Sequence, residues 1–385
     1  MINKDTVEVF KKVETPFYYY DVELLKSTLE LYKSQIDKYG YNAHYALKAN
    51  ANDRILEIIK GYGLGADCVS GNEVKLAVKS GFSPDKIVYA GVGKSDKEIK
   101  AALNAGIFSF NCESVPEIKV INDLAAQMGK KARIALRVNP DIDAHTHKYI
   151  STGRKEDKFG ISPWAFGDVT DLINQCGNVE LIGLHFHVGS QITDMSVFEL
   201  TCRRVEELQK WFIDRNINIA NINLGGGLGV DYINPNEHPI APFEDYFSII
   251  NKNLVVRPGQ RVHFEPGRAI VAQCGHLISR VLYVKVGRQK KFAILDAGMN
   301  DLIRPALYQA YHDIENITSA GRKMRYDVVG PVCESSDRWG HNRMLSKTQR
   351  GDIISINTAG AYGQVMAMKY NQRDLAKAYY SDTIK

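Results

Sequence analysis

Lys48 stands at a position from which its amine could act in chemistry. It directly follows Tyr45–Leu47, a short apolar run with the pattern of a buried strand. A lysine at the end of an interior strand is partly desolvated, and desolvation lowers the pKa of an amine and frees it for Schiff-base chemistry. The alternative is a surface lysine at the start of a loop. The choice between the two depends on which other residues stand at strand ends.

Two glycine-bearing segments follow later strand-like runs. Gly225, Gly226 and Gly227 follow one of them, and Glu265–Arg268, with the sequence Glu-Pro-Gly-Arg, follows the next. Loops after the seventh and eighth strands are the usual phosphate site of α/β barrels, and glycines let backbone N–H groups approach a phosphate closely. Tight turns are the alternative, but a turn does not need three consecutive glycines. We therefore expect a phosphate-binding loop.

Glu265 and His187 complete a set that suits an aromatic cofactor. A carboxylate at a strand end needs a cationic or N–H partner, and a protonated pyridine nitrogen is such a partner. His187 could stack on a cofactor ring, and Ser190 could donate to a phosphate. A lone histidine is more often a core residue, but His185 and His187 share one face of the same strand, so we expect one of them at the mouth of the barrel.

The elements that must position these residues alternate between strands and helices. Short apolar runs are followed by stretches with helical periodicity; Ser95 and Glu98, for example, have the spacing of a capping box. Eight such repeats predict a (β/α)8 TIM-type barrel, and a doubly wound open sheet is the alternative. The eight runs are His44–Leu47, Leu64–Cys68, Ile87–Ala90, Ile107–Phe110, Ala132–Val138, Leu181–His187, Ile219–Leu224 and Val262–Phe264.

After about residue 270 the pattern changes to strands without long helices. The strand-like Phe17–Asp21 near the N-terminus has the same character. We expect an α/β protein in which residues 22–270 form the barrel and residues 1–21 with 271–385 form a second, β-rich domain. Strands are expected at Ile278–Val286, Phe292–Asp296, Tyr326–Val329 and Asp352–Thr358.

The composition excludes several other classes of protein. The 385 residues carry a net charge of +5 without a basic stripe, which argues against a nucleic-acid partner. The six cysteines include no C-x-x-C pair, so no metal site or redox motif is expected. The N-terminus lacks the apolar core of a signal peptide and no apolar run reaches 18 residues, so we expect no membrane association and a cytoplasmic location.

Taken together, these residues resemble the fold-type III decarboxylases that depend on pyridoxal 5'-phosphate. The resemblance covers nearly the whole chain, and the motifs follow one another in the same order as in that family. Three further stretches, 143–160, 299–308 and 330–334, are similar to the diaminopimelate decarboxylase branch of that family. The motifs that carry the resemblance to the whole family are Tyr45–Asn50, His187–Ser190, Gly225–Gly227, Glu265–Arg268 and Cys333–Asp337.

The resemblance implies decarboxylation of meso-2,6-diaminopimelate to L-lysine and CO2, the last step of bacterial lysine synthesis, by a homodimer with shared active sites. Lys48 and Cys333 are implied to be catalytic, with Cys333 donating a proton in the partner's site. The implied cofactor-binding residues are Lys48, His187, Ser190, Gly227, Glu265, Pro266, Gly267, Arg268 and Tyr362. The implied substrate-binding residues are Arg268, Arg304, Tyr308, Glu334 and Tyr362.

Arg304 and Tyr308 also fit this function from their spacing alone. Arg304 precedes Pro305, a favoured first residue of a helix, so Arg304 and Tyr308 would share a face. A guanidinium and a phenol on one face suit a carboxylate. Asp67 is expected to support Lys48 or the cofactor ring.

Three alternatives remain open at this point. Decarboxylases of ornithine, arginine or a carboxypolyamine act on substrates without a second carboxylate, so Arg304 and Tyr308 argue against them. Amino-acid racemases of this fold pair the pyridine nitrogen with arginine rather than with a glutamate such as Glu265. Non-catalytic regulatory relatives usually lack the lysine or the cysteine, whereas Lys48 and Cys333 are both present.

Overall fold

The structure is a computed structural model that describes residues 2–142 and 158–384. The chain forms two compact units. The larger consists of residues 29–229 and 242–267, and the smaller of residues 1–28, 230–241 and 268–385. Most of the similar stretch 143–160 lies outside the described residues, so its expected role stays a prediction.

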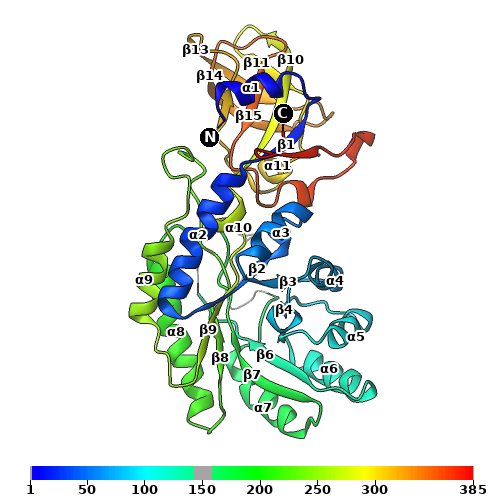
Figure 1. Ribbon diagram of the computed structural model, residues 1–385, viewed down its shortest axis with the longest axis vertical. Helices are drawn as coiled ribbons and strands as arrows, with labels where there is room; N and C mark the ends of the chain where they lie inside the picture. Colours follow the sequence, from blue (N-terminus) through cyan, green and yellow to red (C-terminus); the bar gives the residue numbers. More distant parts are fainter. Residues whose placement is uncertain (1, 143–157, 385) are drawn as a thin grey trace. The chain divides into compact units, whose positions relative to one another are not determined.

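The larger unit contains a closed barrel of eight parallel strands, which confirms the predicted fold class and excludes the open sheet (Figure 1). The barrel closes where Asn42 and Ala43 of the first strand pair with His263 and Phe264 of the last. The barrel strands are β2 (Asn42–Ala46), β3 (Gly65–Cys68), β4 (Ile87–Tyr89), β5 (Ser109–Cys112), β6 (Ala132–Arg137), β7 (Val179–His185), β8 (Asn221–Asn223) and β9 (Arg261–Phe264).

The helices of this unit begin where the sequence supplies caps. Ser95 and Glu98 form the expected capping box, and the side chains of Asn52, Ser70 and Ser114 accept backbone N–H groups at the starts of α3, α4 and α6. The helices are α2 (Val22–Tyr39), whose first residues up to Thr28 belong to the smaller unit, α3 (Asp53–Gly61), α4 (Gly71–Lys79), α5 (Asp96–Ala105), α6 (Val115–Gln127), α7 (Phe166–Gln175), α8 (Ser196–Ile213) and α9 (Phe243–Asn253).

Several strands end earlier than the apolar runs indicate, and two of them, β2 and β7, precede candidate site residues. β2 ends at Ala46, and Lys48 lies in a short 3-10 helix, Leu47–Ala49. β7 ends at His185, where its pairing with β8 stops, so His187 lies two residues beyond the strand rather than at its end. Burial continues past the last paired residue in both places, and apolar content therefore overstates the length of these strands.

The smaller unit is β-rich and is built from both ends of the chain, as predicted. β1 pairs antiparallel with β10 and parallel with β16, the last strand. The sequence does not predict the strands β12, β14 and β16, in which polar residues interrupt the apolar pattern. The strands are β1 (Phe17–Tyr20), β10 (Gly275–Val286), β11 (Lys291–Leu295), β12 (Ile314–Asn316), β13 (Lys323–Val329), β14 (Arg338–Ser346), β15 (Ile353–Ile356) and β16 (Lys377–Tyr380).

Three helices accompany this sheet, namely α1 (Lys4–Phe10), α10 (Arg268–Val271) and α11 (Arg304–Tyr308). Phe10 of α1 packs edge-on against Phe17 and Tyr19 of β1, and these rings form a core with Ile278 and Ile353. The N-terminal segment is thereby fixed to strands that lie more than 250 residues further along the chain.

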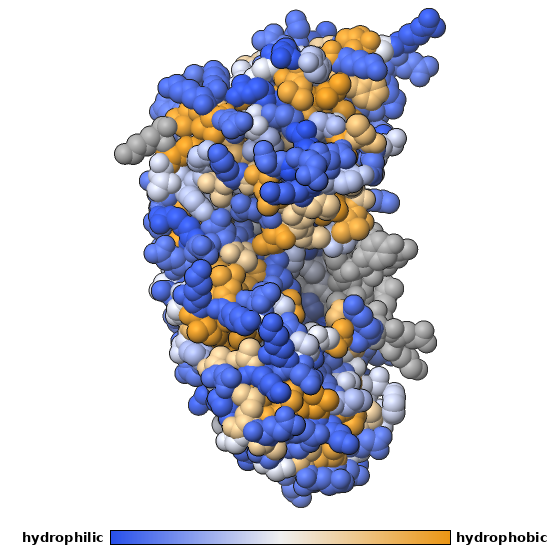
Figure 2. All heavy atoms as spheres, turned by 90° about the vertical axis from the view of Figure 1, so that its right-hand side faces the viewer, coloured by the Kyte–Doolittle hydropathy of each residue, from blue (hydrophilic) through white to orange (hydrophobic). Residues whose placement is uncertain are grey.

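Exposed hydrophobic side chains form small groups among hydrophilic ones on the face drawn in Figure 2. Such groups are normal for a globular protein. Among the described helices, none is both long enough and apolar enough to span a membrane. All six cysteines are free thiols, and Cys333 alone of the six is exposed.

Two buried histidines lie against each other on the neighbouring strands β2 and β9. The rings of His44 and His263 stack with centroids 5.2 Å apart, and His44 Nε2 is 3.0 Å from His263 Nδ1. Burial lowers the pKa of His263 to about 3, and the neighbouring His44 acts in the same direction. Both rings are therefore expected to stay neutral in the folded protein at neutral pH.

We predict that His263 makes the fold sensitive to acid. Its pKa is lower in the folded chain than the unfolded value of about 6.5, so the unfolded chain binds the extra proton between these values. Stability is therefore complete above about pH 6.5 and falls as the pH drops towards 3, by roughly 1.4 kcal/mol per pH unit at most for this group.

The urea midpoint, measured at pH 7.5, 6 and 5, should depend less steeply on pH in His263→Gln than in the wild type. His238→Gln is the matched control because His238 is exposed. Equal slopes for the wild type and His263→Gln would contradict the prediction.

Candidate active site

Lys48 is held beside the barrel by a carboxylate of the neighbouring strand. Its Nζ donates to Oδ2 of Asp67 in β3 at 2.8 Å, as the expected support for Lys48 requires. Asp67 is fully buried, whereas about a third of the Lys48 side chain, 34%, is exposed. Burial raises the pKa of Asp67, and the ammonium of Lys48 opposes this effect. Asp67 therefore fixes the position of the Lys48 amine, while part of the Lys48 side chain remains accessible.

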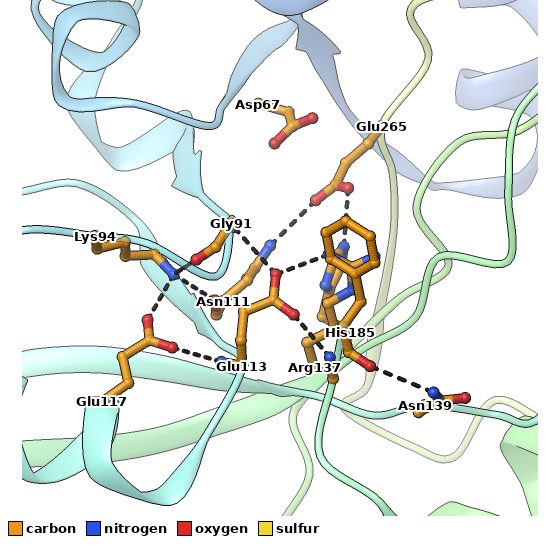
Figure 3. Close-up of polar contacts among 12 residues, drawn as sticks. Asp67, Gly91, Lys94, Asn111, Glu113, Glu117, Arg137, Asn139, His185 and Glu265 are labelled. Carbon is orange, nitrogen blue, oxygen red and sulfur yellow. Dashed lines mark hydrogen bonds and ion pairs between the residues drawn. The ribbon is translucent and has the colours of Figure 1, made fainter. Parts of the chain in front are cut away.

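Glu265, one residue beyond β9, accepts hydrogen bonds on both carboxylate oxygens. Oε1 accepts from the side-chain amide of Asn111 at 3.2 Å, and Oε2 accepts from His185 Nε2 at 2.9 Å (Figure 3). Oε1 also accepts from the side-chain amide of Asn223 at 2.7 Å. These three donors come from β5, β8 and β7, so the closed barrel brings them together.

The surroundings of Glu265 keep its carboxylate ionised. Burial alone would raise its pKa, but the hydrogen bond from His185 and the charge of Lys48 bring the pKa well below its usual range. A buried carboxylate that remains charged at neutral pH can accept a further N–H from a cationic group. This is the property that a partner for a protonated ring nitrogen requires.

His187 lies beyond β7 in a neutral form. Burial lowers its pKa well below the usual value, and the charges of Arg137 and Lys48 act in the same direction. Its Nδ1 accepts the backbone N–H of Gly226 at 3.2 Å, so in the neutral ring the proton is on Nε2. The glycine loop thus fixes both the position and the tautomer of this imidazole.

The glycine loop packs so closely that side chains do not fit. A Cβ on Gly226 would lie 2.3 Å from the carbonyl oxygen of Glu265, and a Cβ on Gly225 would lie 2.4 Å from that of Phe186. Gly227 has a φ of +115°, a conformation that favours glycine. Simple tight turns would not require this contact with two neighbouring strand ends.

The other predicted cofactor residues flank this loop. Ser190 lies in the loop after β7, and nearby Ile192 donates its N–H to the carbonyl of Gly227 at 2.9 Å. The carbonyl of Pro266 accepts the N–H of Ala46 at 2.9 Å, which ties the segment after β9 to the strand before Lys48. Lys48, His187, Ser190, Gly227, Glu265 and Pro266 therefore lie at the carboxyl ends of four barrel strands, with Gly267 next along the chain.

A buried ionic network supports the strand ends on the other side of the rim. Glu113 Oε1 accepts from Arg137 Nη1 at 2.7 Å, and Lys94 donates to Glu117 Oε1 at 2.6 Å (Figure 3). Lys94 also donates to the carbonyls of Gly91 and Asn111, at 2.8 and 2.9 Å. Breaking one buried pair would leave an uncompensated charge, so this network holds the ends of β4, β5 and β6 in register.

Arg268, Arg304, Tyr308 and Tyr362 belong to the smaller unit. Arg304 begins α11 and Tyr308 ends it, as their spacing indicated. Both guanidinium groups are buried, and Arg268 lies over the ring of Tyr362 with Cζ 4.8 Å from its centroid. In the described part of the chain, no carboxylate lies within ion-pairing distance of Arg304. A buried guanidinium such as that of Arg304 favours the binding of an anion.

Cys333 and Glu334 are exposed on the loop between β13 and β14. The buried carboxylate of Asp337 holds this loop by accepting the N–H groups of Met299 at 2.7 Å and Val332 at 2.6 Å. The hydroxyl of Tyr370 donates to Glu334. The thiol is therefore presented at the surface by a well-anchored loop.

Sequence reasoning did not assign roles to several residues of these clusters. Asn223 and His185, which hold Glu265, were not among the predicted site residues, nor were Tyr232 and His312 of the smaller unit. Asn223 carried a usable signal, because it is a polar residue near the end of a mostly apolar run, two residues before the glycine loop.

With this geometry established, comparison with known proteins defines the class. Residues 22–272 match the family model described as the pyridoxal binding domain of pyridoxal-dependent decarboxylases. This match covers more than half of the chain. The chain therefore belongs to the pyridoxal-dependent decarboxylase family, as its motifs predicted, and pyridoxal phosphate is its cofactor.

The similar proteins are diaminopimelate decarboxylases. The chain is 55% identical over 379 residues to that of Bacteroides thetaiotaomicron, covering 98% of both chains. It is 40% identical to that of Aquifex aeolicus, covering 96% of this chain and 87% of that one. The crystal structure of diaminopimelate decarboxylase from Helicobacter pylori complexed with L-lysine matches with a TM-score of 0.92 and 41% identity, over 98% of this chain and 95% of that one.

The residues at the barrel rim fit pyridoxal phosphate. Glu265 is a buried, ionised carboxylate that suits a protonated pyridine nitrogen, and Lys48 offers a partly exposed amine on the same rim. The glycine loop leaves room for a close approach that a Cβ would block. The second oxygen of Asp67, Oδ1, is buried and has no hydrogen-bond partner among the described residues, so a polar acceptor is still available beside Lys48.

We predict that Gly226→Ala weakens the binding of pyridoxal phosphate by more than tenfold. The added methyl would lie 2.3 Å from the carbonyl of Glu265, so the loop must move away from both Glu265 and His187. Absorbance titration of the cofactor into the apo-protein measures the dissociation constant. Gly167→Ala is the matched control, because nothing lies within 4 Å of a Cβ on this helical glycine. Equal affinities in the two variants would contradict the expected role of the loop.

Proposed function

We propose that this enzyme decarboxylates meso-2,6-diaminopimelate to L-lysine and CO2, the last step of bacterial lysine biosynthesis. The observation that carries the chemistry is the pairing, on one barrel rim, of the accessible amine of Lys48 with the buried, ionised carboxylate of Glu265. The identity of the substrate is supported by diaminopimelate decarboxylases that align with this chain over nearly its full length. Solved structures that are only 20% identical to this chain in sequence support its fold but not its substrate.

The barrel residues have distinct roles in this proposal. Lys48 carries the cofactor covalently, and Asp67 positions its amine. Glu265, which His185 holds by a hydrogen bond, would accept a hydrogen bond from the pyridine nitrogen and keep that nitrogen protonated. His187, which the N–H of Gly226 fixes as a neutral ring, would stack on the cofactor. Ser190, Gly227 and the segment Glu265–Arg268, including Pro266 and Gly267, would hold the phosphate and the ring. When bound, the cofactor supplies a sink for the electron pair that is left when CO2 departs.

The smaller unit supplies groups that match both ends of the substrate. The buried guanidinium groups of Arg268 and Arg304, with the phenols of Tyr308 and Tyr362, bind carboxylate. Glu334 provides a negative charge for the ammonium group at the far end of the substrate. Substrates with a single carboxylate, such as ornithine, would leave a buried guanidinium without its anion, which is costly.

Cys333 is proposed to donate the proton that replaces the lost carboxylate, and to do so in the active site of a partner subunit. Two observations support a homodimer: Cys333 and Glu334 are exposed, and the buried Asp337 fixes their loop. The exposed Met368 and Tyr370 lie on the same unit, and Tyr370 bonds to Glu334. We also propose a cytoplasmic location, which suits an exposed free thiol on a biosynthetic enzyme.

We predict that Lys48→Ala abolishes both turnover and the visible absorption of the lysine-bound cofactor. Without the amine, the covalent attachment is lost, whereas Glu265 and the glycine loop remain. The assay measures CO2 release from meso-diaminopimelate, L-lysine, L-ornithine and L-arginine. Lys94→Ala is not a suitable control, because Lys94 is buried in an ion pair. Lys100→Ala, an exposed lysine of α5, serves instead. Turnover by Lys48→Ala, or preference of the wild type for ornithine or arginine, would contradict the proposal.

Shared active sites predict complementation between two inactive variants. Lys48→Ala and Cys333→Ala should each lose most activity, because one lacks the amine and the other the proton donor. In mixed dimers, one of the two sites contains both an intact Lys48 and an intact Cys333. Mixing after dissociation and reassociation should therefore restore about a quarter of wild-type activity overall, since half of the dimers are mixed at equilibrium and each has one intact site. No recovery despite verified mixed dimers would show that Cys333 does not serve a partner subunit.

A further inference from the structure

A cleft of about 520 Å³ lies in the smaller unit, at the turn that joins β10 to β11. Residues of that turn form one part of its wall, and residues of β13 and β14, which belong to the same sheet, line the rest (Figure 1). None of the lining residues belongs to the proposed cofactor or substrate sites. Four basic groups and one acidic group line the cleft, namely Arg288, Lys290, Lys291, Arg325 and Asp327.

The acidic group of the cleft already has partners in the protein. Asp327 is buried, and its Oδ1 accepts the backbone N–H of Asn342 at 2.9 Å. Its Oδ2 lies 3.1 Å from both Lys290 Nζ and His341 Nδ1. Burial alone would raise the pKa of Asp327, but these hydrogen bonds lower it to about 2. Asp327 therefore stays ionised at neutral pH and balances the charge of Lys290.

The three remaining basic groups of the cleft lack an acidic partner. Among the described residues, no carboxylate forms an ion pair with Arg288, Lys291 or Arg325. The ammonium group of Lys291 makes a weak contact with the neutral sulfur of Met324, at 4.0 Å. Like charges around one hollow repel each other, and the walls of a cleft concentrate their electric field. An anion that enters the cleft would relieve this repulsion.

The backbone that carries these basic side chains is held in place. The N–H of Gly287 donates to the carbonyl of Lys290 at 2.8 Å and closes the turn between β10 and β11. On the other wall, Asp327 is the register partner of Phe292 where β11 and β13 pair in parallel. A fixed backbone lowers the entropic cost of gathering several cations around a ligand.

We propose that this cleft binds a small molecule with two or more linked phosphate groups. Each phosphate group carries roughly one and a half to two negative charges at neutral pH, so two of them match three cations without acidic partners. The guanidinium groups of Arg288 and Arg325 can each donate two parallel hydrogen bonds to phosphate oxygens, and Lys291 adds a point charge. The volume suits a small-molecule ligand. This inference does not depend on the proposed function.

The test is a calorimetric titration of inorganic pyrophosphate into the holoenzyme, in which pyridoxal phosphate fills its own phosphate site. Loss of a charged, forked donor in Arg325→Gln predicts a rise of about ten- to a hundredfold in the Kd of pyrophosphate. Arg288→Gln should raise the Kd by a factor of the same order. Arg325→Lys, which keeps the charge but loses the fork, should bind with an affinity between those of Arg325→Gln and the wild type.

Arg322→Gln is the matched control, because it removes the same charge from an exposed arginine of the same unit that does not line the cleft. Its Kd should equal that of the wild type. No binding of pyrophosphate to the wild type, or an equal loss of affinity in Arg322→Gln and Arg325→Gln, would overturn the proposal. Tighter binding of citrate than of pyrophosphate at matched ionic strength would overturn the assignment to phosphates.

ATP, titrated without magnesium in the same way, distinguishes two sources of linked phosphates. Tighter binding of ATP than of pyrophosphate would indicate a nucleotide as the ligand. Equal or weaker binding of ATP would indicate free diphosphate. Both outcomes support the proposed site, provided that Arg325→Gln weakens the binding of the ligand concerned.

Discussion

A carboxylate that stays charged inside a barrel places strong demands on the residues around it. Glu265 is almost fully buried, and an isolated buried carboxylate would be expected to take up a proton. Three side-chain donors on three different strands prevent this by binding both oxygens. The strands must therefore keep their register to within the tolerance of a hydrogen bond. The closure of the barrel and the ionisation of Glu265 depend on the same geometry.

The ionic network on the opposite part of the rim serves the same geometry. Lys94 bonds to two backbone carbonyls and to Glu117, and Glu113 bonds to Arg137 and to the N–H of Gly91. These contacts fix the loops after β4 and β5 from within the structure, without involving Lys48 or Glu265 directly. Only a few residues then need to bind the cofactor or react, because these ionic contacts hold the backbone that carries them. Rigid support of this kind is what precise positioning of a reactive group requires.

The smaller unit contains buried positive charges, the guanidinium groups of Arg268 and Arg304. Arg304 remains buried beside neutral groups, namely the imidazole of His312 and the ring of Tyr232. Neutral partners satisfy N–H groups while leaving positive charge available for an anion. A carboxylate of the protein in that place would stabilise Arg304 better but would compete with a substrate carboxylate. Arg304 thus keeps a positive charge that a carboxylate of a dicarboxylic substrate can neutralise.

The sequence alone determined the fold class and the main chemical groups. Alternating apolar runs and helical stripes indicated a (β/α)8 barrel with a β-rich second domain, because both periodicities are local properties of the chain. Lys48, Glu265 and the three glycines were recognisable because each directly follows such a run. Strand ends were less predictable, as His187 shows, because burial continues beyond the last paired residue.

Only the tertiary structure decided which groups meet. The contacts of Asn111, Asn223 and His185 with Glu265 join strands that are 42 to 154 residues apart in the chain, and they exist because the sheet closes on itself. Tyr232 lies just beyond the glycine loop in sequence, yet it belongs to the smaller unit and contacts the arginines that begin two helices, Arg268 and Arg304. Local patterns identify residues that can do chemistry. Non-local packing sets their partners, and those partners decide the charge and orientation of each group.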